Sequence, residues 1–81
     1  MATTLGQYTG KSDNVSEARK LLEMIDRAGG YDVVLEHCSI RAADFFAEQW
    51  EMKDSQNYQV TGKQLFYLRD IQFDLIEKGI L

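Results

Sequence analysis

The sequence has no proline, one cysteine and one histidine among its 81 residues. A single cysteine excludes an intramolecular disulfide, and the compartment that we expect is a reducing cytosol. Because a structural metal site needs about four ligands, the adjacent pair His37 and Cys38 predicts neither a metal site nor a catalytic pair. We therefore expect no cofactor and no enzymatic activity.

Long apolar runs are also missing. No stretch approaches the ~20 apolar residues of a membrane span. The N-terminus lacks the charged-then-apolar pattern of a secretion signal. The expectation is a cytoplasmic protein without a membrane partner.

The balance of charge is acidic, with nine basic and thirteen acidic residues and a net charge of −4. This balance disfavours non-specific binding to nucleic acid or anionic membranes. The net charge lies in residues 31–60, where the acidic residues are Asp32, Glu36, Asp44, Glu48, Glu51 and Asp54 and the basic ones Arg41 and Lys53.

Small polar residues dominate the N-terminus, and we predict a flexible arm over 1–13 followed by a single helical domain over 14–81. The first helix is expected from Val15 to about Ala28, with Asn14 as its cap. Its apolar positions recur at helical spacing: Ala18, Leu21, Leu22, Ile25 and Ala28. Gly29 and Gly30 predict a left-handed cap at its end.

The stretch Tyr31–Cys38 is ambiguous. Its alternating apolar residues suit a strand, but no second strand is visible to pair with it. A short helix through His37 with Asp32 as its cap is the interpretation that we favour. Ser39 then predicts the start of a helix from Ile40 to about Lys53. The buried face predicted for that helix consists of Ile40, Ala43, Phe46, Ala47 and Trp50.

The C-terminal helix carries the strongest local signals. Thr61 and Gln64 form a capping box. Five apolar residues follow at helical spacing, namely Leu65, Leu68, Ile71, Leu75 and Ile76. Phe66 and Phe73 widen the apolar band to roughly 220° of arc, against ~100° for a surface helix. Such a band must be packed on at least two sides, by this chain or by another subunit. The predicted fold is all-α: three main helices, a short extra one, and the C-terminal helix at the centre.

One row of carboxylates is the best candidate for a site. Asp44, Glu48 and Glu51 follow each other at i, i+4 and i+7, which places them on one helix face. Catalysis by such a row requires a cleft that perturbs its pKa values, and a solvated face is the commoner meaning. We predict a partner-binding surface here, with Tyr58 and Tyr67 as aromatic anchors.

The C-terminal stretch, TGKQLFYLRDIQ, with Asp44-Phe45-Phe46 upstream, resembles the tails of small, mostly uncharacterised bacteriophage proteins. The matching positions are Thr61, Lys63, Gln64, Leu68 and Ile71. The resemblance covers about a third of the chain, consists of a capping box with an amphipathic helix, and assigns no functional residue. It implies a protein-binding antagonist of a host system, such as an anti-CRISPR protein, in the host cytoplasm.

The leading hypothesis is thus an acidic module that occludes a basic, nucleic-acid-binding surface of a host protein or protein–RNA complex. A first alternative is a nucleic-acid-binding accessory protein that uses Lys63, Gln64 and Arg69 in the manner of a recognition helix. A second is a structural or regulatory homodimer whose surplus apolar band is its interface.

Overall fold

The computed structural model describes residues 11–81, which form four helices. In chain order they are α2 (Lys11–Arg27), α3 (Tyr31–His37), α4 (Ile40–Met52) and α5 (Gly62–Glu77). Residues 11–81 contain no strand, so the prediction of an all-α fold with three main helices and a short one is confirmed. Most of the predicted N-terminal arm, residues 1–10, lies outside the described residues.

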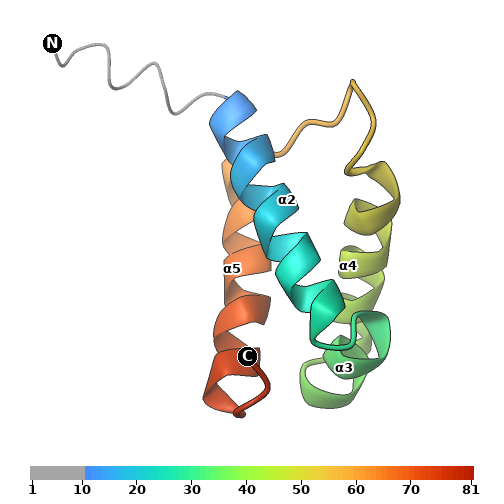
Figure 1. The fold of residues 1–81 in the computed structure, drawn as a ribbon, viewed down its shortest axis with the longest axis vertical. Helices are drawn as coiled ribbons and strands as arrows, with labels where there is room; N and C mark the ends of the chain where they lie inside the picture. Colours follow the sequence, from blue (N-terminus) through green and yellow to red (C-terminus); the bar gives the residue numbers. More distant parts are fainter. Residues whose placement is uncertain (1–10) are drawn as a thin grey trace, which may run out of the picture.

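The helices pack mainly as two pairs. α2 lies along α5, and α3 packs against α4; α5 also contacts α3, and α2 also contacts α4. Figure 1 shows α2 passing between α5 and α4, with the segment 53–61 joining the end of α4 to the start of α5. All four helices and this segment contribute to one apolar core, formed by Ala18, Leu21, Leu22, Ile25, Val34, Ala42, Ala43, Phe46, Tyr58, Val60, Leu65, Leu68, Ile71 and Leu75.

Two helices begin at the side-chain caps that the sequence predicts. At the start of α4, the Ala42 amide donates to Ser39 Oγ at 3.0 Å. At the start of α5, the Gln64 amide donates to Thr61 Oγ1 at 3.1 Å, and the Thr61 amide donates to Gln64 Oε1 at 3.0 Å. Both halves of the capping box are therefore present, and they satisfy amides that have no partner within the helix.

Two glycines turn the chain from α2 into α3. Gly29 and Gly30 have φ angles of 134° and 66°, and the Gly30 amide donates to the Ile25 carbonyl at 2.9 Å. A Cβ atom on Gly29 would collide with the side chain of Val33, so this turn requires glycine. Tyr31–His37 is helical, which confirms the short helix over the strand, although Gly30 rather than Asp32 is its N-cap.

The predicted start of the first helix is wrong. α2 begins at Lys11, and Asn14 lies within the helix instead of capping it. The Asn14 Nδ2 donates to the Val60 carbonyl at 3.1 Å, which ties α2 to the segment before α5. That partner lies 46 residues away in sequence, so the local pattern contained no sign of it.

The buried face of α4 also differs from the prediction. Ile40 is 63% exposed, whereas the polar residues Gln49 and Lys53 are only 2% and 8% exposed. Gln49 is satisfied by the Tyr58 hydroxyl, and the Lys53 ammonium lies 4.4 Å from the centroid of the Trp50 ring. The predicted face did not include Gln49 or Lys53. Ala43 and Phe46 are buried as predicted, and the buried residues of α4 are Ala42, Ala43, Phe46 and Gln49.

The apolar band of α5 is only half covered by this chain. Leu65, Leu68, Ile71 and Leu75 are buried as predicted. Phe66, Phe73 and Ile76 are instead 66%, 59% and 47% exposed. Residues 11–81 therefore leave part of this band exposed, whereas its width predicts packing on at least two sides.

The C-terminal end of α5 has the predicted glycine cap. Gly79 has a φ of 76°, and the Ile80 amide donates to the Leu75 carbonyl at 2.9 Å.

Candidate functional site

The predicted acidic row exists on the surface of α4. Asp44, Glu48 and Glu51 are all exposed. Together with Ala47 they line a shallow hollow of about 340 Å³. Because α4 is anchored by its Ser39 cap and by Phe46 in the core, the three carboxylates are held on a rigid support.

Tyr31 lies at the end of this acidic row, at the start of α3. Its hydroxyl donates to Asp44 Oδ1 at 3.3 Å, and the residue is 37% exposed. Loss of contact with water, followed by the negative charge of Asp44, raises the pKa of the Tyr31 phenol. Sequence reasoning missed Tyr31 because only the packing of α3 against α4 brings it to Asp44.

The two predicted tyrosine anchors lie elsewhere. Tyr58 was expected at a polar, exposed position but is only 7% exposed, and its hydroxyl donates to Gln49 Oε1 at 2.7 Å. Tyr67 is half-buried, and its ring centroid lies 4.6 Å from that of Phe45. Neither tyrosine lines the hollow beside Asp44, so the structure does not join them to the acidic row.

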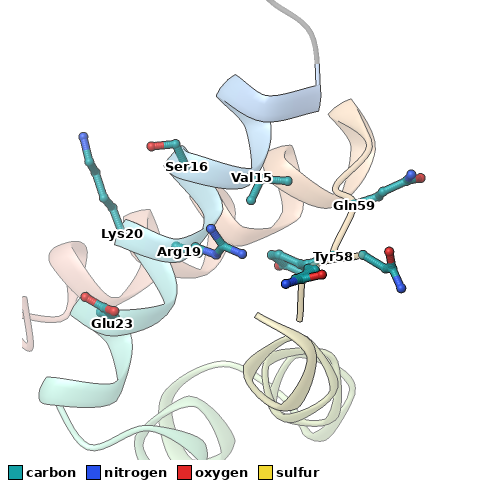
Figure 2. Close-up of a pocket in the computed structure, with 9 residues that line it drawn as sticks. Val15, Ser16, Arg19, Lys20, Glu23, Tyr58 and Gln59 are labelled. Carbon is teal, nitrogen blue, oxygen red and sulfur yellow. The ribbon is translucent and has the colours of Figure 1, made fainter. Parts of the chain in front are cut away.

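A larger pocket of about 600 Å³ lies between α2 and the segment 53–61. Its lining consists of Val15, Ser16, Arg19, Lys20, Glu23, Gln56, Asn57, Tyr58 and Gln59. Figure 2 shows Arg19 pointing from α2 toward Tyr58, while Lys20 points away from it.

Arg19 holds the wall of this pocket together. Its Nε donates to the Lys53 carbonyl at 2.6 Å and one terminal nitrogen donates to the Ser55 carbonyl at 3.4 Å. The same guanidinium lies 5.9 Å from the centroid of the Tyr58 ring. Partial burial raises the pKa of the Tyr58 phenol, and Arg19 opposes that rise. Arg19 thus acts as the anchor of the segment after α4, and sequence spacing gave no signal for this role.

His37 and Cys38 lie at the end of α3, and both are half-buried. Lys78 Nζ donates to the backbone carbonyl of His37. Partial burial, followed by the charge of Asp74, raises the pKa of the Cys38 thiol, which lowers its fraction of reactive thiolate. Within the described range, no group of three or more His, Cys, Asp or Glu residues is placed to hold a metal ion.

The residues named for the nucleic-acid alternative are partly engaged within the chain. Gln64 takes part in the capping box, and Arg69 forms an ion pair with Glu17 at 3.5 Å. Lys63 is exposed at the start of α5.

Searches of family models, curated proteins and solved structures found no match to this chain. Among residues 11–81, no helix has the length and apolar character needed to cross a membrane.

Proposed function

We propose that this chain is a non-enzymatic protein-binding module whose acidic row engages a basic surface on its partner. The observation that supports this most is the combination of exposure and absence of internal pairing. Asp44, Glu48 and Glu51 are exposed on one helix, and none of them forms an ion pair with another described residue. Three carboxylates without a cationic partner among residues 11–81, within about two helical turns, give a concentrated negative potential.

Tyr31 supplies the aromatic part of this surface. Its ring is partly exposed and its hydroxyl is directed to Asp44, so the ring is held in place beside the carboxylates. Tyrosine is frequent at the energetic centre of protein interfaces, because it buries a large apolar ring at a small cost in conformational entropy. In this proposal Tyr31 takes the anchoring role that the sequence assigned to Tyr58 and Tyr67.

The mechanism that we propose is occlusion. A basic surface that binds nucleic acid attracts an acidic row by the same long-range charge that attracts phosphates. The resemblance of the C-terminal third to bacteriophage proteins supports a finer version, in which the chain is a phage inhibitor of a host defence complex, similar to anti-CRISPR proteins. Occlusion requires neither catalysis nor a cofactor.

The test compares two variants of equal charge. Replacing Asp44, Glu48 and Glu51 with Lys changes the net charge from −4 to +2. The control replaces the exposed residues Asp26, Asp70 and Asp74 with Lys, which gives the same net charge but leaves the acidic row and the surroundings of Tyr31 intact. We expect the first variant to lose a partner captured from bacterial lysate, and the control to retain it.

Thermal melts of the same preparations show whether both variants are folded. Exposed carboxylates contribute little to folding, typically within ~0.5 kcal/mol each. Undiminished capture by a folded row variant would remove the acidic row from the mechanism. Equal loss in both variants would show that net charge, rather than this row, governs binding.

No observation favours the nucleic-acid alternative over this proposal. Two of its three residues, Gln64 and Arg69, already have partners within the chain. A salt-dependent shift of a labelled duplex or single strand would revive it.

A further inference from the structure

The pocket between α2 and the segment 53–61 has no part in the proposed function. It shares no lining residue with the hollow of the acidic row on α4, so an inference about it stands independently. Its volume is about 600 Å³. Pockets that bind small molecules hold about 300–1,000 Å³. The size of this pocket therefore suits a small molecule.

The wall that α2 gives to the pocket is cationic, although the chain as a whole is acidic. Lys20 is exposed and forms no ion pair with any residue in 11–81. Arg19 donates to the carbonyls of Lys53 and Ser55, and its remaining N–H groups have no partner in that range. The carboxylate of the lining, Glu23, lies 3.8 Å from the Lys53 ammonium, which offsets part of its charge. This α2 wall therefore favours an anionic group.

The wall that the segment 53–61 gives to the pocket is neutral and rich in carboxamides. The side chains of Gln56, Asn57 and Gln59 are exposed, and none of them forms a hydrogen bond with another residue of the described range. A carboxamide offers a donor and an acceptor in one plane, which is the pattern that pairs with the edge of a nucleobase. This segment wall therefore favours an uncharged group that carries donors and acceptors of its own.

Hydrogen bonds within the chain hold the two walls together. Arg19 binds the segment through two of its carbonyls. The Tyr58 hydroxyl donates to Gln49 Oε1 in the core at 2.7 Å, and Asn14 Nδ2 donates to the Val60 carbonyl at 3.1 Å. A pocket that is formed in advance lowers the entropic cost of binding a ligand.

We propose that this pocket binds a nucleoside phosphate. The phosphate lies against the α2 wall, where Lys20, the unpaired N–H groups of Arg19 and the Ser16 hydroxyl donate hydrogen bonds to it. The base lies against the segment wall and pairs with the carboxamides of Asn57 and Gln59. Figure 2 shows Lys20 and Ser16 on one side of the pocket and Gln59 on the other, which is the separation that a ligand of two parts requires. Phosphate alone contacts one wall, and an uncharged nucleoside contacts the other.

The class of ligand is tested by isothermal titration calorimetry and thermal melts of the full chain. The probes are the common ribonucleoside monophosphates, the matching nucleosides and inorganic phosphate. We expect at least one nucleotide to bind with a Kd at least about tenfold below those of its nucleoside and of phosphate, because only the nucleotide contacts both walls. It should also raise the melting temperature. Neither heat nor a higher melting temperature with any nucleotide would overturn the proposal, and so would equal affinity for phosphate.

A pair of charge variants tests the α2 wall. Lys20→Gln should raise the Kd of the nucleotide by about tenfold, since it removes a charge-assisted hydrogen bond. Lys63→Gln makes the same change at an exposed position of α5 outside the pocket, and it should leave the Kd unchanged. Both side chains are exposed, so both variants should keep the circular dichroism of the wild type. Equal weakening by the two changes would show attraction to charge anywhere on the chain and would overturn the site.

Removal of two carboxamides tests the segment wall. Asn57→Ala combined with Gln59→Ala should raise the Kd of the nucleotide to that of phosphate, because the base loses its partners. Arg19 stays unchanged in this experiment, since it also anchors the segment. A folded double variant that binds the nucleotide as tightly as the wild type would overturn the placement of the base.

Discussion

The hydrogen bond between Tyr58 and Gln49 gives the sharpest prediction about stability. Tyr58→Phe removes one hydroxyl and leaves Gln49 Oε1 buried without its donor, since Gln49 is only 2% exposed. A buried polar group that loses its partner costs about 1–3 kcal/mol. For a domain of this size that corresponds to a fall in melting temperature on the order of 5–20 °C.

A double-mutant cycle isolates the bond from the rest of the environment. Gln49→Leu alone leaves the Tyr58 hydroxyl without its acceptor, whereas Tyr58→Phe with Gln49→Leu leaves no unpaired polar group. The double variant should therefore be at least ~1 kcal/mol more stable than the sum of the two single losses predicts. Chemical denaturation of the four proteins gives the coupling energy directly.

Tyr67→Phe is the matched control for this cycle. The ring of Tyr67 is half-buried against Phe45, and its hydroxyl forms no hydrogen bond with another residue of the described range. Its loss should change stability by no more than ~0.5 kcal/mol. Equal effects of Tyr58→Phe and Tyr67→Phe, or strict additivity in the cycle, would refute the argument that this bond stabilises the fold.

Three further predictions follow from the packing. Leu68→Ala should cost about 2–5 kcal/mol, because Leu68 is fully buried, and a melting temperature that does not move would contradict its place in the core. Thr61→Ala should cost about 1 kcal/mol in chemical denaturation by removing half of the capping box, and unchanged stability would show that the cap is not needed. Cys38 should react with iodoacetamide more slowly than a free cysteine at pH 8, because its raised pKa leaves less thiolate, and equal rates would contradict that shift.

Local signals in the sequence predicted local structure well. The capping box of Thr61 and Gln64 depends on residues three apart, and the structure contains both of its hydrogen bonds. The buried side of α5 followed from the spacing of Leu65, Leu68 and Ile71 in the same way. These features could be predicted because their partners lie within one or two helical turns.

Features that depend on distant partners could not be predicted. Asn14 was expected to cap a helix, but its side chain binds the carbonyl of Val60. Gln49 is buried because Tyr58 satisfies it, and no hydropathy pattern encodes that pairing. The same limit applies to the candidate site: spacing placed Asp44, Glu48 and Glu51 on one face, but the contact of Tyr31 with Asp44 requires the tertiary fold.

Uncovered residues on α5 illustrate a further limit. Periodicity identified Phe66 and Phe73 as part of an apolar band, and it could not distinguish a face packed within the chain from one left exposed. Burial depends on how much surface the other helices can cover. α2 and α3 contact α5, and they leave its outer face open.

The central claim is that the acidic row on α4 binds its partner through charge. The most direct measurement is the affinity of the captured partner for the wild type and for the variant with Lys at 44, 48 and 51, each titrated across a range of salt concentrations. Screening strengthens as the Debye length falls from about 10 Å at 0.1 M to 3 Å at 1 M. We predict that wild-type affinity falls steeply with salt and that the variant is weak at low salt. A wild-type affinity that does not change with salt, matched by the folded variant, would contradict the claim.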